Sequence, residues 1–192
     1  MLVDALQFLL RVTLGLAASA FWLRFYMQWA RVPFHNPFAQ FIVKVTDFAV
    51  RPLRRAIPGL FGLDWASLLL CYLSQLLATL GSLWLVSYPF AVAGWPVTPG
   101  FLLHALAMLL QLALYISMGL ILLQAILSWV NPFSPIAPVF YALARPVLAP
   151  FRRLLPDIAG IDVSPIAAFV VIQLLLITLV AGLERYASGL IW

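Results

Sequence analysis

The chain has 192 residues, of which 65% are hydrophobic and only 9% are charged. A soluble domain carries roughly 25% charged residues, so this composition excludes a single soluble core and indicates an integral membrane protein. Eleven Lys and Arg against six Asp and Glu give a net charge of +5, and most of the cations lie in loops between apolar segments. The positive-inside rule explains this charge more simply than nucleic-acid binding does.

The first apolar stretch predicts a transmembrane helix over about residues 3–28, in which Arg11 and Arg24 stand roughly 20 Å apart along the axis. A basic loop follows over residues 31–64. Within this loop, apolar residues at helical spacing predict an amphipathic helix that either lies on the membrane surface or packs on the helix bundle. Its apolar positions are Phe38, Phe41, Ile42, Val45 and Phe48, with Pro33 and Pro37 before the helix and Pro52 at its end.

The stretch from Trp65 to Ala144 contains no Asp, Glu, Lys or Arg. It is long enough for two transmembrane helices, which we expect at about residues 65–88 and 101–129, with a hairpin rich in Pro and Gly between them. A second basic loop over residues 130–163 contains a weaker amphipathic segment that Pro138, Pro146 and Pro150 interrupt. A fourth transmembrane helix is expected at about residues 164–186.

The thirteen residues from Pro52 to Asp64 recur from Pro150 to Asp162, shifted by 98 positions. The identical residues are Pro52, Arg54, Arg55, Pro58, Gly62 and Asp64, which return as Pro150, Arg152, Arg153, Pro156, Gly160 and Asp162. A two-residue insertion or deletion also aligns Trp29 with Trp129. We therefore predict an all-α membrane protein of four transmembrane helices, built as two tandem parallel repeats over residues 1–98 and 99–192.

The two basic loops hold eight of the eleven cations, whereas the hairpin between the second and third helices holds none. This asymmetry predicts that both loops, each with its amphipathic segment, are cytoplasmic and that both termini lie on the opposite side of the membrane.

The duplicated unit resembles the YggT family of small membrane proteins, also called the YlmG family. The resemblance is carried by Ser128-Trp129, Arg145-Pro146-Val147-Leu148-Ala149-Pro150, Arg152-Arg153-Leu154-Leu155-Pro156 and Gly160-Ile161-Asp162-Val163-Ser164-Pro165. The first copy departs from this pattern, with Gln28-Trp29 in place of Ser-Trp and Trp65-Ala66-Ser67 in place of Ser-Pro after the aspartate. The resemblance implies a multi-pass protein of the bacterial inner membrane, linked to osmotic-stress tolerance, cell division or membrane-complex assembly. It implies no agreed biochemical activity.

Both arginine pairs stand just before a helix that re-enters the membrane. Arg54, Arg55, Arg152 and Arg153 either fix the topology through generic headgroup contact or form a specific site for anionic lipid or a protein partner. Asp64 and Asp162 are expected to cap the following helices and to pair with a neighbouring arginine. A cation site made of the two carboxylates is the alternative.

Gln75 and Gln173 lie eleven residues beyond these aspartates, near the middle of the membrane. We expect a hydrogen bond between their helices, or else a polar pathway lined by both side chains. In the outer part of the membrane we expect a salt bridge between Arg11 and Glu184, for which Arg185 competes.

No motif for catalysis or metal binding was found. His35 and His104 are isolated, with no Cys or carboxylate at metal-ligand spacing. We expect no enzymatic activity, no cofactor, no metal and no nucleic-acid partner. The favoured function is a non-enzymatic membrane scaffold or accessory factor that contacts lipid headgroups and a membrane-protein partner or a second copy. The alternative is a small oligomeric transporter or channel component in ion or osmotic homeostasis.

Overall fold

The computed structural model describes residues 1–33, 35–57, 59, 62–131, 133–155 and 162–192. Four of its helical segments are long and apolar enough to cross a membrane. They are α1 (Leu2–Trp29), α3 (Trp65–Leu85), α5 (Thr98–Val130), and α7 (Ser164–Leu175) continued by α8 (Ala181–Ile191). The described residues contain no strand, so the predicted all-helical fold with four membrane-length helices is confirmed. Within the two repeated segments, residues 58, 60–61 and 156–161 lie outside the described residues, and they include Pro58, Pro156 and Gly160 of the predicted repeat.

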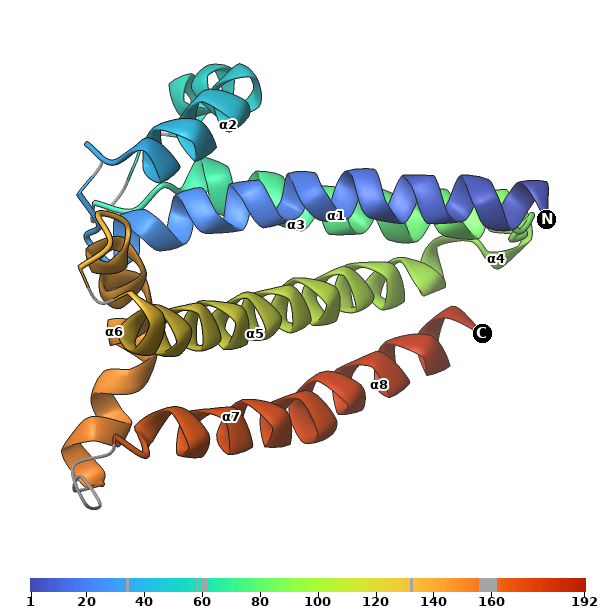
Figure 1. The fold of residues 1–192 in the computed structure, drawn as a ribbon. Coiled ribbons are helices and arrows are strands. Elements are labelled where there is room, and N and C mark those ends of the chain that lie inside the picture. The colour runs from blue at the N-terminus through green and yellow to red at the C-terminus, as the bar shows by residue number, and fades with distance from the viewer. Residues whose placement is uncertain (34, 58, 60–61, 132, 156–161) are drawn as a thin grey trace.

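The four long helices lie roughly alongside one another (Figure 1). Helix α1 packs along α3, α5 packs on both α3 and α8, and the α7–α8 segment forms the opposite edge. The two termini lie at one end of this layer, next to the short helix α4 (Phe90–Ala93). Helices α2 (Pro37–Ala56) and α6 (Ala137–Leu154) lie at the other end, which we call the basic end because the two arginine pairs belong to these helices.

Helix α2 begins as expected but does not end at Pro52. The side chain of Asn36 caps it by accepting the backbone N–H of Ala39 at 2.8 Å, and Pro37 takes the first helical position. The helix then runs through Pro52 to Ala56, and the backbone N–H of Ile57 donates to the oxygen of Leu53. Proline removes a single backbone donor, and the hydrogen bonds resume directly after it, so the predicted end was wrong.

The segment that three prolines were expected to break is one continuous helix, α6. Pro138 lies in its first turn, where the missing N–H has no helical acceptor in any case. Pro146 and Pro150 stand one turn apart, on the side opposite Ala144 and Leu148, which are buried. Burial of that apolar face offsets the lost hydrogen bonds, so the predicted interruption was also wrong.

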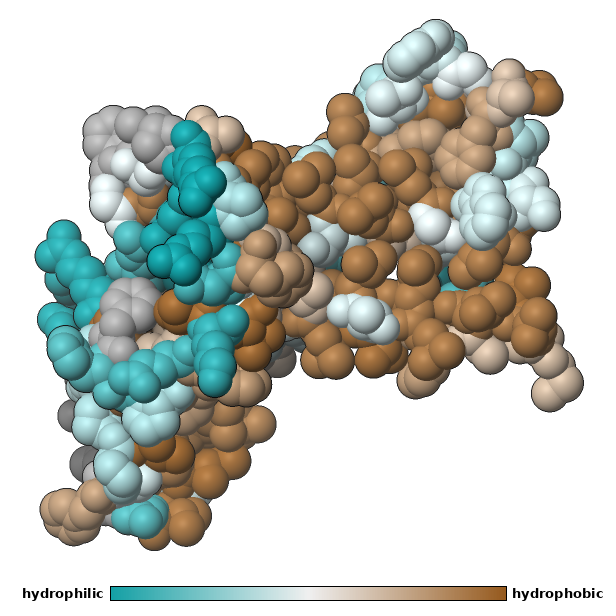
Figure 2. All heavy atoms as spheres, turned by 90° about the horizontal axis from the view of Figure 1, so that it is seen from above, coloured by the Kyte–Doolittle hydropathy of each residue, from teal (hydrophilic) through white to brown (hydrophobic). Residues whose placement is uncertain are grey.

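The apolar residues of α2 face two ways. Ile42 is buried against the bundle with Ala39, whereas Phe41, Val45 and Phe48 are exposed. Helix α2 therefore packs on α1 and α3 and also presents an apolar strip outward. In Figure 2, hydrophilic residues gather at the basic end and hydrophobic residues cover the long helices.

Two buried tyrosines join the first half of the chain to the second. The Tyr26 hydroxyl donates to the backbone oxygen of Leu143 in α6 at 2.8 Å, and the Tyr88 hydroxyl donates to the oxygen of Ile191 at 2.6 Å. Near this second contact, a Cβ added at Gly100 would lie 2.8 Å from the Ile191 side chain, so α5 and α8 approach closely there. A π-helical turn over Leu176–Val180 joins α7 to α8.

Candidate functional site

Asp64 is placed by a turn and by the start of α3. Gly62 adopts a φ of 74°, a conformation that glycine takes without steric cost, two residues before the aspartate. Asp64 is the N-cap of α3, and its carboxylate accepts the hydroxyl of Ser67 at 2.7 Å and the backbone N–H of Ser67 at 3.4 Å. Its side chain is only 1% exposed.

Two arginines share this buried carboxylate. Arg54 approaches Asp64 side-on, with Nε 3.1 Å from Oδ1 and Nη2 in contact with Oδ2. Arg24, which is 5% exposed, places Nε 3.3 Å from Oδ2. Its other nitrogens contact Asp47 Oδ1 at 2.9 Å and donate to Thr46 Oγ1 at 2.8 Å and to the backbone oxygen of Val43 at 3.2 Å. We call Arg24, Asp47, Arg54 and Asp64 the first-half site.

No partner for Arg24 was predicted from the sequence. An arginine in a spanning helix must face a partner or a polar region, so its presence in the first apolar stretch already indicated that a polar group lies beside it. Burial disfavours the charged form of Asp64, but hydrogen bonds from Arg54 and Ser67, together with the charges of Arg54 and Arg24, outweigh it. The pKa of Asp64 is therefore lower than that of an ordinary aspartate.

A similar pair lies before α7. Arg152 Nε donates to Asp162 Oδ2 at 2.8 Å, and Asp162 Oδ1 accepts the backbone N–H of Ser164 at 2.9 Å. Asp162 precedes Val163, the N-cap residue of α7, so it supports the helix start from one position outside the predicted cap. Burial opposes the charged form of Asp162, but the contacts with Ser164 and Arg152 prevail and lower its pKa.

Arg152 also stacks on an aromatic ring. Its guanidinium carbon lies 5.3 Å from the centre of the Tyr141 ring, and Nη1 donates to the Tyr141 hydroxyl at 3.2 Å. We call Gln124, Tyr141, Arg152 and Asp162 the second-half site. Because each aspartate is held by its own arginine, the alternative of one cation site shared by both carboxylates is not supported. The described residues also contain no group of three potential metal ligands.

The second arginine of each pair points elsewhere. Arg55 and Arg153 are exposed and stand next to the arginines that hold the carboxylates. Each pair thus has one arginine that holds an aspartate, Arg54 (44% exposed) or Arg152, and a second, exposed arginine, which we call the outer arginine.

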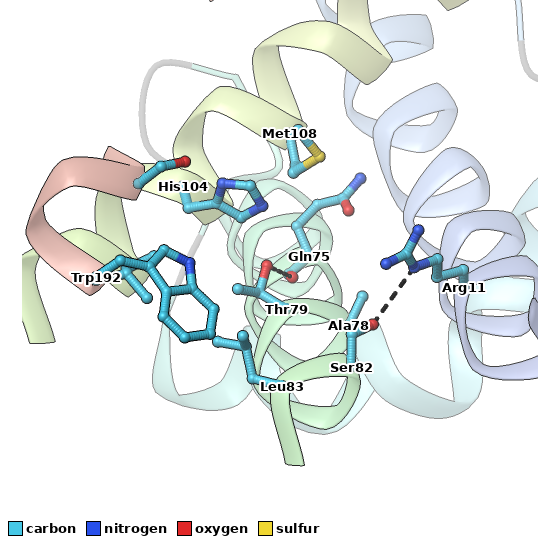
Figure 3. A pocket seen from close by; sticks show the side chains of 11 residues that line it. Arg11, Gln75, Ala78, Thr79, Ser82, Leu83, His104, Met108 and Trp192 are labelled. Atoms are coloured by element: carbon cyan, nitrogen blue, oxygen red, sulfur yellow. Dashed lines mark hydrogen bonds between the residues drawn. The ribbon is translucent and has the colours of Figure 1, made fainter. Parts of the chain in front are cut away.

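The predicted salt bridge between Arg11 and Glu184 is absent. Arg11 Nε contacts Ser82 Oγ at 3.5 Å on α3 (Figure 3). The buried Oε1 of Glu184 accepts no hydrogen bond from the described part of the chain. The prediction was wrong because α1 packs along α3, whereas α8 packs along α5.

The predicted hydrogen bond between Gln75 and Gln173 is absent as well. Gln75 lines a cavity of about 490 Å³ near the end where the termini lie, together with Arg11, Thr79 and His104 (Figure 3). Gln173 is exposed on α7. This prediction was wrong because α5 lies between α3 and the α7–α8 segment. The cavity beside Gln75 does not include Gln173, so the two side chains do not line a common pathway within one chain.

Comparison with known proteins identifies the group to which the chain belongs. The family model CCB3/YggT matches residues 3–85 and again residues 103–183. The uncharacterized protein YggT of Escherichia coli K12 is 38% identical over 164 residues, which cover 85% of this chain and 82% of that protein. An uncharacterized protein of Pseudomonas aeruginosa is 38% identical over 155 residues, which cover 80% of this chain and 77% of that protein.

A shorter relative extends the comparison beyond bacteria. The uncharacterized protein ycf19 of Guillardia theta is 36% identical over 63 residues, which cover 31% of this chain and 69% of that protein. No solved structure matches the chain. The match of the family model across most of the chain and the identity to these relatives confirm the predicted family: the chain belongs to the CCB3/YggT family.

Proposed function

We propose that the protein is a non-enzymatic scaffold or accessory factor of the bacterial inner membrane, whose basic end contacts anionic lipid headgroups and a membrane-protein partner. The observation that carries this proposal is the exposed surface of the basic end, where the outer arginines, Arg55 and Arg153, lie on the helices that flank the long bundle. A role in osmotic-stress tolerance, cell division or membrane-complex assembly would use this surface.

The proposed orientation places the basic end in the cytoplasm and both termini in the periplasm. The gathering of α2, α6 and their cations at one end supports this orientation through the positive-inside rule. We also propose that the chain arose as two tandem repeats, over residues 1–98 and 99–192. Support comes from the family model, which matches twice, and from the arginine–aspartate pair, which recurs with the same separation of ten residues.

The surface of α2 fits a membrane interface. Arg51 and Arg55 are exposed on the same helix as the apolar strip of Phe41, Val45 and Phe48. An amphipathic helix of this kind inserts its apolar strip beside the headgroups while its cations meet anionic phosphates. Each cation near the surface contributes about 1 kcal/mol of attraction to an anionic membrane.

Lipid selectivity tests this proposal. The protein is reconstituted with trace spin-labelled phosphatidylglycerol or phosphatidylcholine, and electron paramagnetic resonance measures the motionally restricted fraction of each. We expect selective restriction of phosphatidylglycerol, which Arg55→Gln/Arg153→Gln weakens several-fold and high salt reduces. The matched control is Arg185→Gln, which removes an exposed arginine from α8 in the outer half of the bundle. Equal restriction of both lipids by the wild-type protein would contradict the proposal.

One observation favours the alternative function in transport. The cavity beside Gln75 lies among the spanning helices and contains polar groups, including Arg11 and His104. The buried Nδ1 of His104 and Oε1 of Glu184 find no hydrogen-bond partner among the described residues. Polar groups at this depth are typical of substrate or ion pathways.

Ion flux in proteoliposomes separates the two functions. The wild-type protein is compared with Gln75→Leu, which removes an amide from the cavity, and with Gln173→Leu, which removes an exposed amide from α7. The scaffold proposal expects no flux above that of empty liposomes. Flux that Gln75→Leu abolishes and Gln173→Leu retains would establish transport instead.

A further inference from the structure

A buried amide oxygen in the second-half site has no hydrogen-bond donor among the described residues. Gln124 is 9% exposed, and its Oε1 accepts no hydrogen bond from the residues that the structure describes. The side chain lines a cavity of about 950 Å³, which it shares with Trp129, Tyr141, Arg152 and Asp162. A buried amide oxygen without a donor costs about 1–3 kcal/mol, which a ligand donor at this side chain would offset.

In the first half of the chain, an arginine occupies the position that corresponds to Gln124. The alignment that matches Trp29 with Trp129 also matches Arg24 with Gln124. A cavity of about 550 Å³ beside Arg24 is lined by residues that match residues of the larger cavity in the two alignments. The matched pairs are Arg24 and Gln124, Gln28 and Ser128, Gln40 and Pro138, Val43 and Tyr141, and Arg54 and Arg152. The two cavities therefore occupy equivalent places.

The two cavities differ at several matched positions, and at 24/124 the first half has a guanidinium where the second half has a neutral amide. In the first half, the guanidinium of Arg24 covers Asp64, whose side chain is 1% exposed. In the second half, the shorter neutral amide of Gln124 leaves Asp162 34% exposed. A ligand that supplies a positively charged N–H donor beside Asp162 would complete the arrangement that Arg24 makes within the chain.

The remaining walls of the cavity narrow the class of ligand. Arg152 provides a cation that suits a phosphate, and Tyr141 supports it from one side. Leu122, Ile166 and Phe169 line the same cavity from the spanning helices α5 and α7, where hydrocarbon chains lie in a membrane. An ammonium, a neighbouring phosphate and acyl chains occur together in a phospholipid with a primary amine.

We propose that the second-half cavity binds the headgroup of a primary-amine phospholipid of the phosphatidylethanolamine type. Its ammonium donates to Asp162 and to the oxygen of Gln124, and its phosphate accepts from Arg152. Rotation of the Gln124 amide about its last torsion brings that oxygen to the cavity without moving the rest of the side chain. This site holds a single lipid through N–H donors, and it does not depend on the proposed contact of Arg55 and Arg153 with anionic lipids.

Native mass spectrometry of the purified full chain tests the proposal. The protein is titrated with phosphatidylethanolamine, phosphatidylcholine and phosphatidylglycerol of identical acyl chains. We expect retention of one phosphatidylethanolamine, at least tenfold above phosphatidylcholine, whose quaternary ammonium has no N–H to donate. Equal retention of these two lipids, or preferential retention of phosphatidylglycerol, would overturn the proposal.

Two variants locate the site. Gln124→Arg places in the second half the residue that the first half uses, so it should reduce phosphatidylethanolamine retention to the level of phosphatidylcholine. Gln124→Leu removes the acceptor and should reduce retention several-fold, and it serves as the decisive variant if Gln124→Arg does not fold. The control Gln173→Leu removes an exposed amide outside the cavity and should retain the lipid. Wild-type retention in whichever of the two Gln124 variants folds would overturn the assignment.

Discussion

The first-half and second-half sites contain the same arginine–aspartate pair but differ in how completely it is enclosed. Arg24 binds both Asp64 and Asp47 and leaves the first carboxylate almost inaccessible. At the matching position Gln124 makes no such contact, and Asp162 stays partly exposed beside a larger cavity. The comparison teaches that the same arginine–aspartate pair can form a closed structural element or the wall of an open cavity, and that Arg24 is one of the residues that close the first site.

Removing Arg24 should produce the largest effect. Arg24→Leu leaves the buried Asp64 with Arg54 alone and deprives Asp47 and Thr46 of their partner. Loss of one member of a buried ion pair costs about 3–5 kcal/mol, so we expect a large drop in the thermal unfolding midpoint in detergent. The matched variant Gln124→Leu removes an unpaired acceptor and should leave the midpoint nearly unchanged or raised. An equal drop of the unfolding midpoint in the two variants would contradict the difference between the two sites.

Replacing the aspartate should also cost more stability in the first-half site than in the second-half site. Asp64→Asn leaves two arginines facing a neutral amide in a buried place, and we expect a loss of about 2–4 kcal/mol in unfolding free energy. Asp162→Asn acts on a partly exposed pair, for which about 0–1 kcal/mol is typical. Steric-trapping measurements of unfolding in bicelles would check both values. A larger loss for Asp162→Asn would contradict the difference in enclosure.

Acid should weaken both sites. The folded protein lowers the pKa of Asp64 and of Asp162, so their stabilisation is fully present above the unfolded value of about 3.9 and is lost as the pH falls through the folded values. The thermal midpoint should therefore fall between about pH 5 and pH 3. Asp64→Asn should flatten this dependence more than Asp162→Asn does. A midpoint that rises on acidification would have the wrong sign for lowered pKa values.

The smallest expected effect concerns the ring that supports Arg152. Tyr141→Phe removes the hydroxyl that accepts from Arg152 and keeps the aromatic face. We expect a loss of less than about 1 kcal/mol, because this contact is exposed. Tyr141→Leu removes the face as well and should lower the unfolding midpoint further. Identical midpoints for the two variants would show that the ring does not stabilise the guanidinium.

The sequence predicted local features well because they depend on neighbours along the chain. Hydropathy identified the four long helices, and Arg54 and Asp64 are only ten residues apart, so their contact follows from one turn and one helix start. The proline rules failed at Pro52 and Pro146 because they describe a local cost, whereas burial of the opposite helix face is a tertiary gain.

Contacts between distant helices were predicted poorly. The proposed partners of Arg11 and Gln75 assumed that their helices were neighbours of α8 and α7, and hydropathy contains no information on which helices are adjacent. The role of Arg24 was missed for a related reason. Its partners Asp47 and Asp64 come from a loop helix and a helix start, and only the folded chain brings them to the end of α1.

The π-helical turn at Leu176–Val180 sets the angular phase of the last helix. A π turn holds one residue more than an α turn, so each position in α8 is rotated by about 100° relative to a continuous α-helix begun at Ser164. With this offset, Ala187 and Ile191 meet α5 at the close approach of Gly100. If the same residues formed an uninterrupted α-helix without the wider turn, Ile191 would be rotated away from Gly100. The π turn thus accommodates one additional residue in the last spanning segment while Ala187 and Ile191 keep their contact with α5.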